Sequence, residues 1–73
     1  MALEIIEAPI TGKVISVEAK AGDVVKEGDV ICFIESMKME NPILAPVAGT
    51  ITEIKVSVDQ MIETSSVIAI IEY

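Results

Sequence analysis

The side chain best suited to chemistry is a lysine at position 38, which stands between two methionines in the segment ESMKME, residues 35–40. Lysine normally keeps its ammonium group in water, whereas methionine normally fills gaps in a hydrophobic core. A lysine amine is a nucleophile only after it loses its proton, and this segment holds no histidine or second cation that would assist the loss. Lys38 is therefore a candidate acceptor of a group that another enzyme activates.

Other reactive side chains are scarce in the chain. It has no histidine, so the usual general base and the commonest metal ligand are both missing, which disfavours a self-contained hydrolase or zinc site. Cys32 is the only cysteine, so no internal disulfide or cysteine-based metal cluster can form, and the chain fits a reducing compartment. We interpret Cys32 as a small buried filler rather than a nucleophile.

Length and charge limit the partners that the chain can have. Its 73 residues allow one domain at most. The net charge of −7 repels phosphate backbones and anionic membrane surfaces, so nucleic-acid binding is not expected. The purest apolar run, residues 67–71, is far shorter than the roughly 20 residues of a membrane span, and the chain does not open on a basic leader. We expect a cytoplasmic domain without direct membrane insertion.

An internal repeat organises the sequence. Sliding the chain by 37 residues lays residues 8–35 over residues 45–72. Identical residues then fall together at seven places: Ala8 and Ala45, Pro9 and Pro46, Gly12 and Gly49, Val30 and Val67, Ile31 and Ile68, Ile34 and Ile71, and Glu35 and Glu72. Because similar sequences follow similar backbone paths, the repeat predicts an internal pseudo-twofold.

The repeat units are predicted to be β-structure. Gly22 and Gly28 would each cost a helix about 1 kcal/mol in the first unit, and half of residues 50–73 are β-branched, which favours strands. We predict strands over residues 13–19 and 30–35 in the first unit, and over residues 50–56 and 67–72 in the second. The apolar spacing slips once within the first strand of each unit, which indicates a β-bulge or a bend.

Two connections and one apolar residue complete the local prediction. The sequence KEGD, between Val25 and Val30, is predicted to be a short hairpin connection with Gly28 at positive φ. Residues 36–42 join the two units between strands that end at Ile34 and start near Ile43. They are predicted to be the exposed tip of a hairpin, which would display Lys38. Met61 is predicted to belong to the core.

The segment from Glu35 to Asn41, together with the repeat, resembles a known family. It reads Glu-Ser-Met-Lys-Met-Glu-Asn and is similar to the Glu-Ala-Met-Lys-Met-Glu-Asn motif of the biotinyl carrier domains of biotin-dependent carboxylases, decarboxylases and transcarboxylases. The resemblance extends from about Ala8 to Glu72. It implies an all-β fold, a flattened β-barrel or sandwich (barrel-sandwich hybrid) of two four-stranded antiparallel sheets, with residues 1–73 as a single carrier domain.

The same resemblance implies a role for five residues of the motif. The ε-amine of Lys38 would be joined to biotin by an amide bond, and Met37 and Met39 would help a biotin protein ligase to recognise the hairpin. Glu35 and Glu40 could take part in docking. The domain would be non-catalytic and would carry a carboxyl group on biotin between a biotin carboxylase and a carboxyltransferase or decarboxylase subunit.

Three other interpretations stay open on the sequence. A lipoyl carrier domain would also display a lysine, but there aspartate usually precedes the lysine and alanine follows it. An unmodified structural module of the same fold would need no displayed lysine. A stand-alone enzyme is opposed by the missing histidine and by the small surface available for an enclosed pocket.

The chain departs from the family pattern at a few positions. Ser36 replaces the usual alanine, and the second repeat unit lacks the usual glycines near positions 59 and 65. Asp59 tolerates unusual turn angles, so we expect the fold to be kept. The connection after Val17 has no room for the protruding thumb of bacterial acetyl-CoA carboxylase carriers. This favours a decarboxylase, a transcarboxylase, or a pyruvate or propionyl-CoA system.

Overall fold

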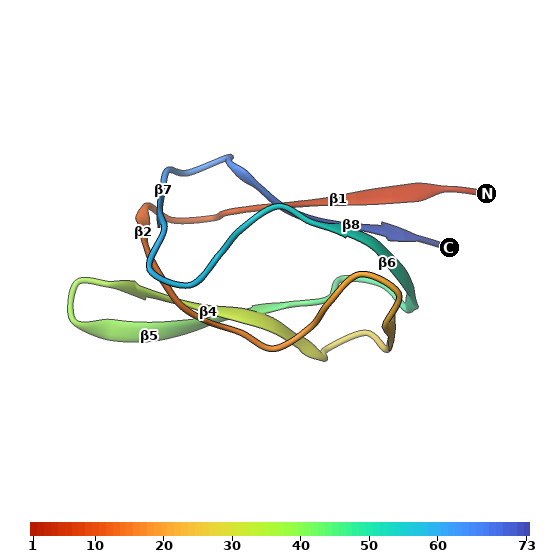
Figure 1. Cartoon of the computed structure of the whole chain (residues 1–73), viewed down its shortest axis with the longest axis horizontal. Coiled ribbons are helices and arrows are strands. Elements are labelled where there is room, and N and C mark those ends of the chain that lie inside the picture. Colours follow the sequence, from red (N-terminus) through yellow and green to blue (C-terminus); the bar gives the residue numbers. More distant parts are fainter.

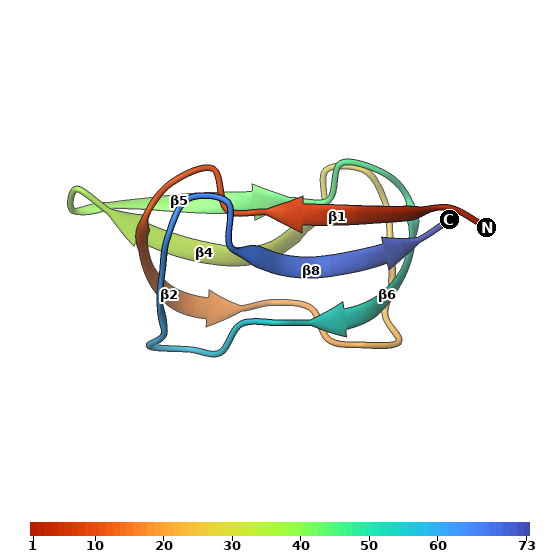
Figure 2. The same ribbon diagram turned by 90° about the horizontal axis from the view of Figure 1, so that it is seen from above.

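Eight strands and no helix make up the computed structural model, which describes residues 1–73. The strands are β1 (Leu3–Glu7), β2 (Gly12–Val17), β3 (Val24–Val25), β4 (Val30–Ser36), β5 (Met39–Leu44), β6 (Gly49–Ile54), β7 (Met61–Ile62) and β8 (Val67–Glu72). They form two four-stranded antiparallel sheets (Figures 1 and 2). Sheet 1 has the order β1-β8-β6-β3 and sheet 2 the order β5-β4-β2-β7. No helix is present that could cross a membrane.

The pseudo-twofold predicted from the repeat is confirmed by the strand order. A shift of 37 residues carries β2 onto β6 and β3 onto β7 without any change of bounds. Exchanging β1 with β5, β8 with β4, β6 with β2 and β3 with β7 turns the order of sheet 1 into that of sheet 2. Each sheet therefore contains strands from both halves of the chain, so neither half forms a complete sheet alone.

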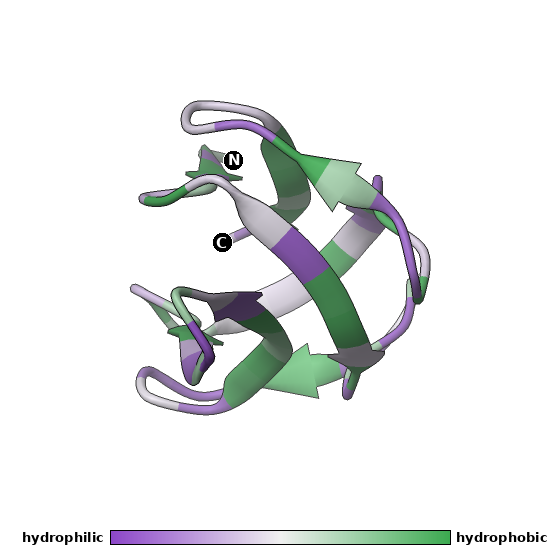
Figure 3. Cartoon of the chain, turned by 90° about the vertical axis from the view of Figure 1, so that its left-hand side faces the viewer, coloured by the Kyte–Doolittle hydropathy of each residue, from purple (hydrophilic) through white to green (hydrophobic).

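The core lies between the two sheets and is built almost entirely from aliphatic side chains. Sixteen buried residues form one cluster, and all are isoleucine, valine or alanine except Cys32. Figure 3, seen along the long axis, shows the strands arranged around this core. The Cys32 side chain is 0% exposed, and burial raises the pKa of its thiol to about 11. The interpretation of Cys32 as a buried filler is confirmed, and its repeat partner Ala69 is equally buried.

The bulge predicted in the first strand of each repeat unit is confirmed. The pairing of β2 with β4 changes register between Val14 and Ser16. The pairing of β6 with β8 changes register between Ile51 and Glu53, at the equivalent place. Because the extra residue bends each strand, the bulges help the two sheets to curve around the core.

The KEGD connection is a tight turn but not a hairpin. Gly28 has φ of 93°, as predicted. However, β3 pairs with β6, whereas β4 pairs with β2 and β5, so this turn joins strands of opposite sheets. A glycine at positive φ serves a hairpin and a crossing turn equally well, and local sequence does not separate them.

The second repeat unit makes the same turn with different residues. Ser65, at φ of 76°, occupies the place of Gly28. The Ser66 hydroxyl accepts a hydrogen bond from the amide of Glu63 at 3.2 Å, where the first unit uses the Asp29 carboxylate. Asp59 also adopts a positive φ, of 74°, as its residue type led us to expect.

The prediction that Met61 belongs to the core is wrong. Met61 is 67% exposed because β7 is an edge strand and Met61 pairs with Lys13, placing its side chain on the outer face of sheet 2. The next residue, Ile62, pairs with Gly12 and is buried. Successive strand residues point to opposite faces, so only one of the two can enter the core.

Candidate functional site

Lys38 lies at the tip of the β4–β5 hairpin, the only place where two consecutive strands pair with each other. The tip projects at one end of the molecule, and both chain termini lie at the other end (Figures 1 and 2). Glu35 pairs with Glu40, and Ser36 pairs with Met39. Only Met37 and Lys38 are left to form the turn.

The hairpin tip is tighter than the predicted tip of residues 36–42. Strand β4 continues to Ser36, and β5 begins at Met39 rather than near Ile43. Pro42 lacks an amide hydrogen and would interrupt a central strand, but β5 is the edge strand of sheet 2 and tolerates it. The two strands therefore remain paired up to the two residues that form the turn.

The turn has an unusual backbone for its residue types. Met37 has φ of 54° and Lys38 has φ of 64°, as a two-residue type I′ turn requires. Asparagine and glycine are the residues that favour this geometry, and a residue with a full side chain loses about 1 kcal/mol there. Backbone strain of this kind clusters at functional sites, where the residue type is retained for another purpose.

Met37→Asn is expected to raise the free energy of unfolding by about 1 kcal/mol, because asparagine tolerates positive φ better than methionine. Urea denaturation of the wild type and the variant measures the change. Met61→Asn is the control, since Met61 is also exposed but is not among the residues at positive φ. An equal or lower stability of the Met37→Asn protein would show that the turn is not strained.

The Lys38 ammonium group is exposed and takes no part in an ion pair. The two ion pairs in the structure join Lys13 Nζ to Asp59 Oδ1 at 3.5 Å and Lys55 Nζ to Glu53 Oε2 at 3.1 Å. Their side chains are all about half exposed or more, so these pairs are screened by water. Lys38 is thus open to reaction with a partner.

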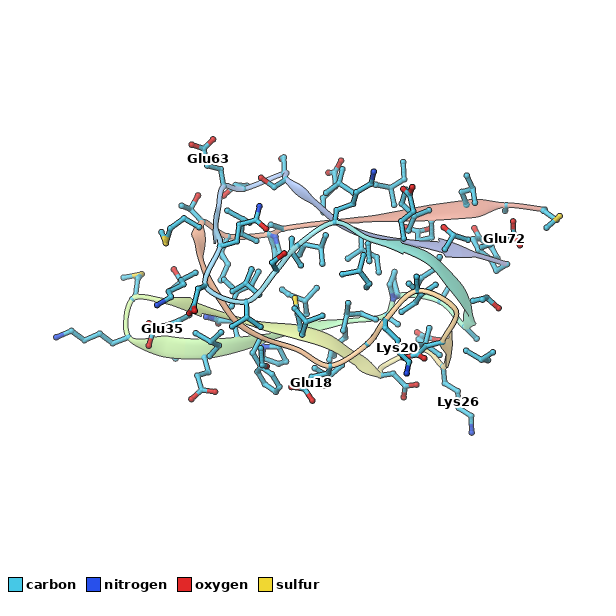
Figure 4. The ribbon with its side chains drawn as sticks, in the orientation of Figure 1. Glu18, Lys20, Lys26, Glu35, Glu63 and Glu72 are labelled. Carbon is cyan, nitrogen blue, oxygen red and sulfur yellow. The ribbon has the colours of Figure 1, made fainter.

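Two glutamates lie on either side of the turn. Glu35 and Glu40 face each other across β4 and β5, and like charges in directly opposed positions destabilise a sheet. Glu35 lies in the hairpin, whereas Lys20 and Lys26 lie toward the other end of the molecule (Figure 4). Apart from Lys38, the charged residues of the hairpin are Glu35 and Glu40, and both are negative.

The methionines on either side of Lys38 are exposed to solvent. The Met37 side chain is 91% exposed and that of Met39 is 66% exposed. A shallow hollow beside the tip is lined by Met37 and Lys38 from the hairpin and by Lys13 and Met61 from β2 and β7. Exposed apolar side chains grouped in this way are a typical mark of a protein–protein contact.

The sequence-based prediction assigns no role to two residues that hold the hairpin in place. Asn41 Nδ2 donates hydrogen bonds to the carbonyl oxygens of Ile34 at 3.3 Å and Met39 at 3.1 Å. A Cβ atom at Gly12 would overlap the Glu35 carbonyl group, so only glycine lets β2 approach β4 next to the hairpin tip. The signals were present, because Asn41 ends the family motif and Gly12 is identical in the repeat.

The site displays an amine on an exposed turn. No group of three or more histidine, cysteine, aspartate or glutamate side chains is placed to hold a metal ion. The chain contains no histidine, and its only cysteine is buried. An exposed amine on a two-stranded arm suits acylation by a separate enzyme and presentation of the attached group.

The chain is similar to known proteins whose names refer to biotin. The sequence profile of the family described as biotin-requiring enzyme matches residues 4–71. The chain is 43% identical to the biotinylated protein TB7.3 homologue of Mycobacterium leprae, over 93% of this chain and 96% of that protein. It is 40% identical to the mitochondrial pyruvate carboxylase of Mus musculus, over 92% of this chain but only 6% of that protein.

A solved structure shows the same fold. A chain in the crystal structure of the Kluyveromyces lactis urea carboxylase superposes with a TM-score of 0.92 and 29% identity, covering 99% of this chain and 6% of that chain. This chain therefore spans a small part of the large carboxylases that it resembles and nearly the whole of the mycobacterial protein. Other relatives include decarboxylase and carboxylase subunits and a biotin carboxyl carrier protein.

Proposed function

Because this chain belongs to the family of biotin-requiring enzymes, we propose that the ε-amine of Lys38 is the site to which biotin is joined by an amide bond. The chain is a biotin carboxyl carrier domain with covalently attached biotin as its cofactor, and it is not itself a catalyst. The observation that carries the assignment to Lys38 is its position, exposed and without an ion-pair partner, in the two-residue turn of the only hairpin.

The chemistry of the cofactor and the work of the protein are separate. Biotin, when attached, supplies a ring that accepts a carboxyl group at one catalytic centre and releases it at another. The residues of this chain hold Lys38 at the tip of a two-stranded arm, and Asn41 and Gly12 make close contacts with that arm near the turn. Tethering in this way raises the effective concentration of the ring at both centres.

The domain works together with carboxylase and carboxyltransferase components. We propose that residues 1–73 act as a single carrier domain, in the cytoplasm, and that the partners are a biotin carboxylase and a carboxyltransferase or decarboxylase subunit. A biotin protein ligase attaches the cofactor. We propose that the ligase recognises the exposed Met37 and Met39 and that Glu35 and Glu40 serve as docking charges. The positions of these four residues on both sides of Lys38 support this proposal.

The intact mass of the protein tests the identity of the attached group. After incubation with biotin protein ligase, biotin and ATP, the unmodified protein is expected to gain the mass of one biotinyl group. A parallel incubation with lipoate ligase, lipoic acid and ATP is expected to leave its mass unchanged, because methionines stand on both sides of Lys38. A lipoyl adduct without a biotinyl adduct would overturn the proposal in favour of the lipoyl carrier.

A further inference from the structure

Every methionine of this protein lies at its surface, and three of the four lie at the end that displays Lys38. Met1 is 100% exposed, Met37 91%, Met39 66% and Met61 67%. Met37 and Met39 flank Lys38, and Met61 lines the hollow next to it, whereas Met1 lies at the opposite end (Figure 1). The buried core contains no methionine. The accessible sulfur of the folded domain is therefore concentrated around the attachment point.

An exposed thioether reacts with hydroperoxides. The sulfur attacks one peroxide oxygen, so that the O–O bond breaks and an S–O bond forms. The sulfur is oxidised by two electrons, and hydrogen peroxide is reduced and leaves as water. The product, methionine sulfoxide, is polar and chiral, whereas the methionine side chain is flexible and apolar. Sulfoxide reductases reverse the change.

We propose that Met37 and Met39 are a modification site for hydroperoxides, at which reversible oxidation to the sulfoxide blocks the attachment of biotin to Lys38. The inference rests on the proposed function, since it requires a ligase that binds the hairpin at these two side chains. Both are next to Lys38 in the chain, so a ligase that reaches the Lys38 amine meets them. Their conversion from apolar to polar groups removes the apolar surface available for that contact.

The buried core of the molecule is protected from the same oxidant. Cys32 is 0% exposed, and its thiol stays protonated because burial raises its pKa to about 11. The thiolate is the reactive form of cysteine, so a buried thiol is inert. Because no methionine packs in the core, sulfoxides form without opening a cavity or placing an oxygen among the aliphatic side chains. Oxidation changes recognition and leaves the sheets intact.

The test compares attachment rates before and after oxidation of the unmodified protein. Biotin-free protein is used, because the thioether of biotin is itself oxidisable. The protein is treated with hydrogen peroxide, the sulfoxides are located by peptide mass spectrometry, and kcat/KM of biotin protein ligase is measured. We expect kcat/KM to fall by about tenfold or more when Met37 and Met39 are oxidised, with an unchanged melting temperature. Treatment with both methionine sulfoxide reductases, one for each epimer, should restore it.

Met61→Leu is the matched control, because it removes the third sulfur of this end and leaves the two that flank Lys38. It should lose attachment on oxidation as the wild type does. An oxidised wild-type protein that is biotinylated at the untreated rate would overturn the inference, as would a loss that the reductases do not reverse. Failure of the untreated protein to be biotinylated would instead contradict the proposed function, so the two failures are distinguishable.

Discussion

Lys38→Arg is expected to abolish biotin attachment and leave the fold intact. Arginine keeps the positive charge, but its guanidinium group is not an amine that accepts the biotinyl group. The change costs little stability, because Lys38 is exposed and belongs to neither ion pair of the structure. Co-expression with biotin protein ligase, followed by blotting with labelled streptavidin, measures attachment. We expect no signal from the variant and full signal from the wild type.

Lys13→Arg is the matched control for this variant. Lys13 lines the same hollow as Lys38, so it is a neighbouring amine that a non-selective reaction would also modify. It lies within β2 and is paired with Asp59, whereas Lys38 stands in the turn. We expect the Lys13→Arg protein to be biotinylated like the wild type. A persistent signal from Lys38→Arg that disappears in Lys13→Arg would move the site to Lys13.

Gly12→Ala is expected to lower the free energy of unfolding by about 3 kcal/mol, because the added methyl group overpacks the junction of β2 and β4. Its Cβ atom would overlap the Glu35 carbonyl group and crowd the Ile34 side chain, and neither a backbone group nor a fully buried side chain can easily move. Urea denaturation followed by circular dichroism gives the change in stability. A loss below about 0.5 kcal/mol would show that the two strands separate freely.

The repeat provides a matched control in Gly49→Ala. A Cβ atom at Gly49 would overlap the Glu72 carbonyl group in the same way, at the equivalent junction of β6 and β8. We expect a similar loss of stability from both variants. Only Gly12→Ala displaces the β4–β5 hairpin near its tip, so only it should slow biotin attachment under conditions where both proteins are folded. Equal attachment rates would show that Gly12 serves the fold alone.

The strands could be predicted from sequence because the repeat shows most of them twice. Residues 50–73 alone are compatible with a helix face, and the glycines of the first unit exclude that interpretation for the second. The pairing of strands could not be predicted in the same way. The KEGD turn contains Gly28 at positive φ, as expected, yet it leads from one sheet to the other. The pairing depends on distant strands rather than on the turn.

The site was predictable to the extent that it is written in consecutive residues. Lys38 and its methionines stand in one motif, but the positive φ angles of the turn do not follow from methionine or lysine, which disfavour them. The close approach at Gly12 depends on Glu35, which is distant in sequence but close in space. The prediction that Met61 belongs to the core is wrong because its apolar type does not indicate which face of an edge strand it occupies.

The central claim is that one lysine, Lys38, carries biotin. Peptide mapping of the protein after reaction with biotin protein ligase, biotin and ATP tests it most directly, because tandem mass spectrometry locates the adduct on a single residue. We predict the biotinyl group on Lys38 and on none of the other lysines, which lie at positions 13, 20, 26 and 55. Biotin on one of those lysines, or an unmodified protein beside a control substrate that the same ligase modifies, would contradict the claim.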